Sequence, residues 1–156
     1  MALDFNSRLE RGIVVTLLML LALVNGDFSN GLNGWNAGAG WSAHKGVAVL
    51  ETNGASNMCS DVVALDGARR IEGGASVKAQ DTGAGYVFVG VQWFDAKGAP
   101  MWTEMLDSNE GKPSRVWHRL QFETLGPKKA RGVAFCFFTN AYGGTYRARV
   151  DNVTMK

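Results

Sequence analysis

The segment from residue 86 to residue 94 constrains the fold more than any other part of this 156-residue chain. Its side chains alternate between two sides, as they do along a pleated strand. One side consists of Val87, Val89, Val91 and Trp93. The other side consists of Phe88, Gly90, Gln92 and Phe94. The pattern predicts a long strand that buries one face, and the turn sequence 95–98 after it predicts that the chain then reverses.

The rest of the chain after residue 24 follows the same scheme of short apolar stretches separated by Gly, Asn, Asp and Ser. No stretch keeps a helical period over three turns, and 20 glycines with 10% aromatic residues suit short strands and tight turns. Further strands are expected at residues 47–51, 58–65, 70–80, 101–105, 117–124, 132–139 and 146–155. This even spacing predicts one all-β domain, a sandwich or a barrel.

A hydrophobic segment precedes this domain. Residues 13–24 form an apolar run of 12 residues, whereas a helix that crosses a bilayer needs about 20. The length fits the core of a secretory signal, but acidic residues accompany the basic ones before it. Three interpretations stay open: a cleaved signal, a membrane-associating segment, and a retained arm that packs against a partner, which we favour. Apolar residues every four positions permit a helix in this arm, which we assign to residues 1–22.

Four motifs of the body stand in a recognisable order. Residues 23–35 read Leu-Val-Asn-Gly-Asp-Phe-Ser-Asn-Gly-Leu-Asn-Gly-Trp, and the strand 86–94 runs into an acidic turn. Trp117 then opens a strand, and residues 150–155 close the chain as Val-Asp-Asn-Val-Thr-Met. This order resembles jelly-roll carbohydrate-binding modules of the 4/9 type, which are related to galactose-binding-like domains. The resemblance implies a jelly-roll sandwich of two antiparallel sheets over residues 23–156, and says less about function.

The same resemblance implies a structural calcium ion between the first turn and the closing strand. Asp27 and Asp151 are the candidate ligands, since calcium prefers hard oxygen donors. Ser29 and Asn152 stand where the family often has further acids, which weakens the expected site. The alternative is that both aspartates accept hydrogen bonds within their own turns. We expect no other cofactor.

A glycan-binding surface would need exposed aromatic faces for the sugar rings and polar groups for their hydroxyls. The candidates for binding a glycan or a partner are Phe88, Gln92, Phe94, Trp102, Arg119, Gln121 and Tyr142. The alternative for aromatic residues is the core, which we expect to hold Trp35, Trp93, Trp117, Phe122, Phe135 and Phe137. Trp41 and Trp102 flank loops and fit either role. The phenylalanines at 88, 94 and 138 also suit contact with a neighbouring subunit.

The two cysteines are far apart in the sequence and lack the spacing of a metal site. Cys136 lies within an apolar run, where a buried free thiol is common. We therefore favour free thiols at Cys59 and Cys136 over a disulfide, which would require an oxidising compartment.

Enzymatic activity is not expected. The chain has two histidines and no nucleophile elbow, phosphate loop or zinc-protease motif. Glu104 and Asp107 are a carboxylate pair in principle able to act on a glycoside, but we expect them in a solvated polar loop.

Two functions from different classes fit these observations. The favoured one is a structural protein of an assembly, such as a virion decoration, cement or fibre protein, attached to sister subunits or a shell through residues 1–22. The alternative is an exported, lectin-like glycan-binding module. Both place the protein on a virion surface or outside the cell. A net charge of +2 gives no reason to expect nucleic acid as a partner, and a membrane partner is not expected either.

Overall fold

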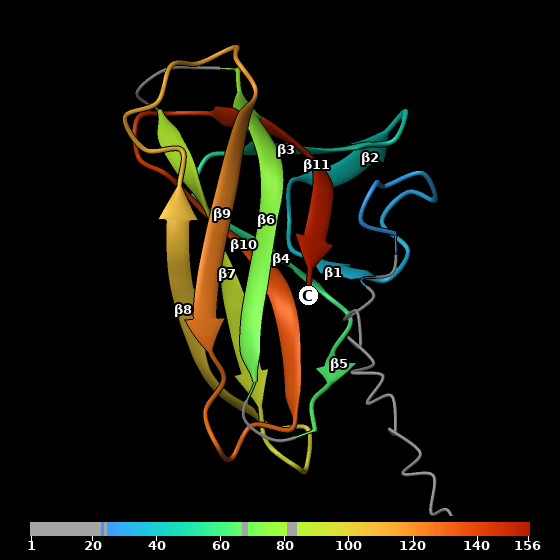
Figure 1. The fold of residues 1–156 in the computed structure, drawn as a ribbon. Helices are drawn as coiled ribbons and strands as arrows, with labels where there is room; N and C mark the ends of the chain where they lie inside the picture. The colour runs from blue at the N-terminus through green and yellow to red at the C-terminus, as the bar shows by residue number, and fades with distance from the viewer. Residues whose placement is uncertain (1–22, 24, 67–68, 81–83) are drawn as a thin grey trace, which may run out of the picture.

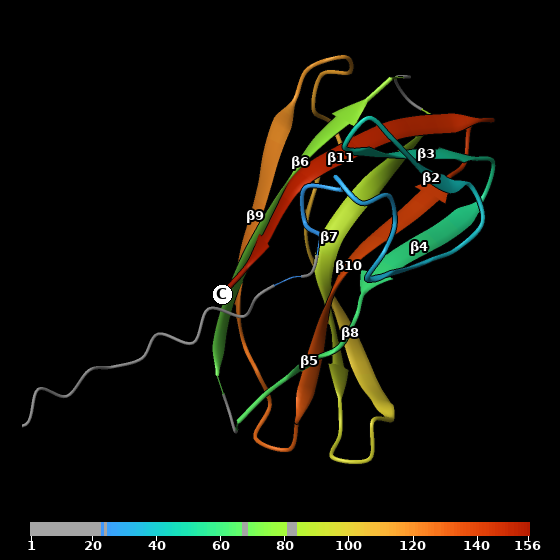
Figure 2. The ribbon, with the colours of Figure 1, turned by 90° about the vertical axis from the view of Figure 1, so that its right-hand side faces the viewer.

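A computed structural model describes residues 23, 25–66, 69–80 and 84–156. The predicted arm at residues 1–22 lies outside these described residues. The regular elements of the described part are all β-strands, and none of it forms a helix long and apolar enough to cross a bilayer. Two antiparallel sheets face each other, as Figures 1 and 2 show. This architecture confirms the predicted all-β jelly-roll sandwich.

Sheet A has six strands, arranged in the order β1-β4-β10-β7-β8, with the short strand β5 also pairing with β10. Its strands are β1 (Trp35–Ala37), β4 (Ala55–Ser60), β5 (Val63–Ala64), β7 (Gly85–Phe94), β8 (Pro100–Ser108) and β10 (Gly132–Ala141). The stretch predicted as one strand at 58–65 is thus divided between β4 and β5. β10 and β7 pair along ten residues at the centre of the sheet.

Sheet B has five strands in the order β2-β3-β11-β6-β9. They are β2 (Trp41–His44), β3 (Val47–Thr52), β6 (Arg70–Ala79), β9 (His118–Leu125) and β11 (Tyr146–Met155). In Figure 1, β9, β6 and β11 lie in front of β7, β10 and β8 of sheet A. The edge strands β8 and β9 come close to each other at one side of the sandwich.

The core lies between the sheets and follows the alternation predicted for residues 86–94. Val87, Val89, Val91 and Trp93 are all fully buried. Aromatic rings from sheet A fill the middle, where the Trp35 and Phe137 rings lie 5.9 Å apart. Trp41, whose role the sequence left open, is buried as well.

The prediction that Trp117 belongs to the core is wrong, because its side chain is 43% exposed. Trp117 precedes the first residue of β9, so it lies in the connecting loop rather than on the inner face of the sheet. The core members predicted beside it, including Phe122 and Phe135, are buried.

The resemblance also implies a first strand within residues 23–35, but this segment is a series of turns, since β1 begins only at Trp35. Asn25 organises these turns from a left-handed backbone conformation, with φ of 57°. Its amide donates to the carbonyls of Gly31 and Asn33 and accepts from the backbone N–H of Asn30. The indole of Trp35 donates to the Asn25 carbonyl at 3.1 Å. The motif that carries the family resemblance is therefore a set of hydrogen-bonded turns that contributes Phe28 and Trp35 to the core.

Candidate functional site

The outer face of sheet A carries a cluster of aromatic rings, of which one is exposed and two are half-buried. The alternation of β7 that buries its valines turns Tyr86 and Phe88 to the opposite side, where their ring centroids lie 5.0 Å apart, edge to face. Tyr142 follows β10 in the next loop and is 62% exposed. Its ring lies 5.7 Å from that of Tyr86. We call these three residues the aromatic cluster.

A groove of about 430 Å³ runs beside this cluster. Strands β4, β7, β8 and β10 line it with Ala55, Ser56, Asn57, Tyr86, Phe88, Met105, Phe138, Thr139 and Asn140. The lining contains amides, hydroxyls, aromatic rings and one thioether, and no Asp, Glu, Lys, Arg or His. The groove is therefore suited to an uncharged ligand with both apolar and hydrogen-bonding surfaces.

Two amides give the groove its directional polar groups. Asn57 on β4 and Asn140 on β10 are exposed, and no hydrogen bond of either side chain forms within the described part of the chain. Each amide offers two donors and one acceptor oxygen. These groups are available to a bound molecule without breaking any bond of the fold.

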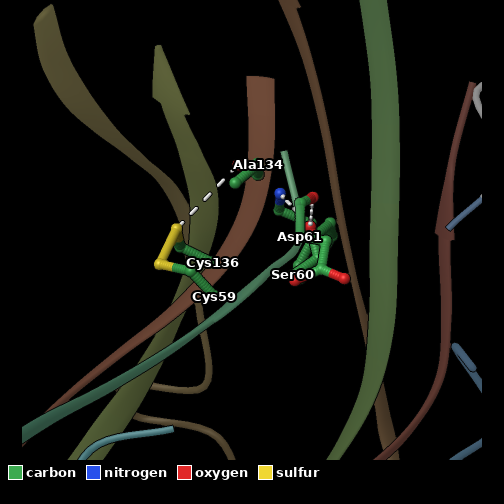
Figure 3. The surroundings of a disulfide bond; sticks show 6 residues. Cys59, Ser60, Asp61, Ala134 and Cys136 are labelled. Atoms are coloured by element: carbon green, nitrogen blue, oxygen red, sulfur yellow. Dashed lines mark hydrogen bonds between the residues drawn. A yellow bond between two sulfur atoms is a disulfide. The ribbon is translucent and has the colours of Figure 1, made fainter. Parts of the chain in front are cut away.

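A disulfide joins β4 and β10, two of the four strands that line this groove. Cys59 on β4 and Cys136 on β10 are direct neighbours in register, and their sulfurs are bonded. The prediction of two free thiols is therefore wrong, because antiparallel pairing brings residues 77 positions apart in sequence to a Cα separation of 4.1 Å. Figure 3 shows the sulfurs on the side of the strands away from Ser60, which is buried in the sandwich. The disulfide thus belongs to the outer face, with Asn57 and Phe138 as the next residues on that face.

The predicted binding residues do not lie together on one surface. Phe88 lines the groove and Tyr142 adjoins it, while Gln92 and Phe94 lie on the same outer face farther along β7. Arg119 and Gln121 lie on β9, on the outer face of sheet B, so they do not share a site with Phe88.

Four residues at the groove were not predicted from the sequence: Tyr86, Asn57, Met105 and Asn140. Tyr86 could have been predicted, because it lies two residues before Phe88 on the same strand and therefore faces the same side. The other three come from β4, β8 and β10, and only the strand order brings them to the groove.

Trp102 and Glu104 form a separate group on β8, not in the predicted polar loop. The indoles of Trp93 and Trp102 both donate to Oε1 of Glu104 at 3.1 Å, and Thr124 of β9 donates to Oε2 at 2.6 Å. Burial raises the pKa of Glu104, but these hydrogen bonds outweigh burial and leave the pKa below its ordinary value. Glu104 therefore ties the edges of the two sheets together, which corrects the prediction that it is merely solvated.

The two candidate calcium ligands make hydrogen bonds within their own turns. Oδ1 of Asp27 accepts from the backbone N–H and the hydroxyl of Ser29, which lowers the pKa of Asp27. Oδ1 of Asp151 accepts from the N–H of Asn152. No group of three or more His, Cys, Asp or Glu side chains suited to a metal occurs in the described residues. Two carboxylates already used in this way fit calcium poorly, and the ion stays a prediction.

No protein-family model matches this sequence, and no curated protein is detectably similar to it. Solved structures do share the fold. A family 16 carbohydrate-binding module is 19% identical with a TM-score of 0.58, over 86% of this chain and 98% of the other. A CBM4 structure is 12% identical with a TM-score of 0.62, over 86% and 99%. The enzymatically active domain of bacteriophage CBA120 tailspike protein 4 is 12% identical with a TM-score of 0.58, over 87% of this chain and 21% of the other. The protein thus has the jelly-roll fold found in carbohydrate-binding modules.

Proposed function

We propose that this protein is a glycan-binding module and that it binds through the outer face of sheet A. The observation that carries this proposal is the aromatic cluster, in which Tyr142 is exposed and Tyr86 and Phe88 are half-buried, beside an uncharged, amide-lined groove. The jelly-roll fold shared with carbohydrate-binding modules supports the same role. The proposal does not involve catalysis.

The chemistry of the groove matches that of a neutral sugar. The C–H face of a pyranose ring is apolar and packs against an aromatic ring, here the exposed Tyr142. The hydroxyls around its edge need donors and acceptors, and Asn57 and Asn140 supply both. The groove volume of about 430 Å³ lies within the range of small-molecule sites.

The disulfide supports a location outside the reducing cytosol. Disulfides persist in secreted proteins and on virion or cell surfaces. We therefore place the protein in an extracellular setting or on a virion surface, where glycans are accessible.

Substitution at the aromatic cluster tests the proposal. We expect Tyr142→Ala to weaken binding to a glycan identified on a polysaccharide array by about fivefold to tenfold, since loss of a stacked ring costs roughly 1–1.4 kcal/mol. Leu125→Ala is the matched control, because Leu125 is 72% exposed and lies in sheet B. If Tyr142→Ala and Leu125→Ala bind equally well, the outer face of sheet A is not the binding surface.

A second candidate function is attachment to an assembly, as in a virion decoration protein. Its specific support is the shared fold with part of a bacteriophage tailspike. The attachment would use residues 1–22, which lie outside the described residues. Comparing the full chain with a chain that starts at Leu23, by light scattering and circular dichroism, tests this function. Equal oligomeric states in two folded proteins would count against the arm as an assembly element.

A further inference from the structure

A second groove lies on the opposite side of the sandwich, on the outer face of sheet B. Its volume is about 450 Å³. Strands β6, β9 and β11, together with the last residue of the chain, line it with Glu72, Gly73, Arg119, Gln121, Phe122, Glu123, Thr154 and Lys156. No residue of this groove contributes to the aromatic cluster or to the groove beside it. The two surfaces are therefore independent.

The guanidinium of Arg119 is held in a defined position at this groove. It donates to the carbonyl of Asn152 and, at 2.6 Å, to the hydroxyl of Thr154. Asn152 lies in a β-bulge of β11, where the regular pairing with β6 is interrupted. Gly74 makes room for the guanidinium, since a Cβ at that position would lie 3.2 Å from Nη2 of Arg119. Burial lowers the pKa of Arg119, which remains charged near neutral pH.

The other charged side chains of the groove each form an ion pair, either with one another or with Arg70 next to the groove. Lys156 lies 3.0 Å from a carboxylate oxygen of Glu72, and Arg70 forms an ion pair with Glu123. Arg119 is thus the cation of the groove that has no carboxylate partner among the described residues. Two of its five N–H donors are used by β11, and the others are free for a ligand.

The remaining polar groups define the rest of such a ligand. The Gln121 side chain makes no hydrogen bond within the described part of the chain and offers both donors and an acceptor. The carboxylates of Glu72 and Glu123 lie opposite each other in register and accept hydrogen bonds. A complementary ligand carries one negative charge for Arg119 and several hydroxyls for these acceptors.

We propose that this groove is a second binding site and that it takes a carboxylated sugar residue, with the sugar carboxylate on Arg119 and the hydroxyls toward Gln121, Glu72 and Glu123. A carboxylate forms bidentate, charge-assisted hydrogen bonds with a guanidinium. A consequence of this second site rests on the proposed function at sheet A: with both sites occupied, the protein joins two glycan segments.

The test is an NMR titration of the full-length, ¹⁵N-labelled protein with sodium D-glucuronate and with D-glucose. The two sugars differ only at C6, which is a carboxylate in one and a hydroxymethyl group in the other. We expect saturable shifts of Gln121 and of the Arg119 Nε–H signal with glucuronate, with a dissociation constant in the millimolar range, and much weaker shifts with glucose. Equal responses to both sugars, or no saturable shift on β6, β9 and β11, would overturn the proposal.

Four variants complete this test, two in the groove and two outside it. Arg119→Gln should weaken glucuronate binding at least about tenfold, the effect of losing a charge-assisted hydrogen bond. Gln121→Ala should also weaken binding, and its exposed side chain forms no hydrogen bond that the fold would lose among the described residues. Arg149→Gln is the matched control, since it removes the same charge from the same sheet outside the groove. Equal glucuronate binding by Arg119→Gln, Gln121→Ala and Arg149→Gln would refute the site. Tyr142→Ala should leave glucuronate binding unchanged, which separates this site from the proposed function.

Discussion

Removal of the Cys59–Cys136 disulfide should strongly destabilise the fold. The loss in free energy of unfolding follows from the length of the loop that the bond closes. The bond closes a loop with a sequence separation of 77, which contains β5 to β9 and the connections between them. The loop-entropy relation gives about 4.5 kcal/mol for a loop of that length at 25 °C. For a domain of this size, such a loss corresponds to a fall of roughly 9–18 °C in Tm.

The assay is urea unfolding of the wild-type protein and of the double variant Cys59→Ala/Cys136→Ala, each with and without a reductant. The wild type should lose stability in reductant, and the double variant should be less stable and indifferent to reductant. No other cysteine is present to complicate the comparison. An oxidised wild type with the same unfolding midpoint as the double variant would refute the reasoning, as would two titratable thiols in the native protein.

Three further predictions concern single side chains. Asn25→Ala should lower the free energy of unfolding by about 1–3 kcal/mol, because the opening turns lose their bonds to its amide, whereas exposed Asn36→Ala should change it little in the same urea assay. Gly90→Ala should cost about 1–3 kcal/mol, since the new Cβ would lie 1.8 Å from the Glu104 carbonyl, and an unchanged urea midpoint would contradict that contact. Because folding lowers the pKa of Glu104, ionised Glu104 stabilises the fold at pH values above its ordinary pKa of 4.5. This stabilisation is lost as the pH falls through the folded-state pKa. Between pH 6 and pH 3 the wild type should therefore lose more stability than Glu104→Gln, and equal losses would show that Glu104 is not responsible.

The two grooves differ in a way that bears on function. The groove of sheet A is lined by aromatic and amide groups, and the groove of sheet B by charged groups. An aromatic platform discriminates by the shape of a ring face, whereas a fixed guanidinium discriminates by charge. If both proposals hold, salt should weaken binding at sheet B and affect the aromatic cluster little.

The sequence by itself determined the fold class and much of the core. Alternation along residues 86–94 reflects the period of two of a pleated strand, so it predicted the buried valines and the outward-facing Phe88 without any tertiary information. The motif at residues 23–35 led to the jelly-roll resemblance, although its local structure is turns rather than a strand.

Only the tertiary structure decided which residues share a surface. Arg119 and Phe88 both point away from the core. They nevertheless lie on opposite sides of the sandwich, because β9 and β7 belong to different sheets. The disulfide and the hydrogen bonds of Glu104 likewise depend on contacts between residues far apart in the chain. Strand order and register arise from packing of the whole domain, and a local sequence pattern carries no information about them.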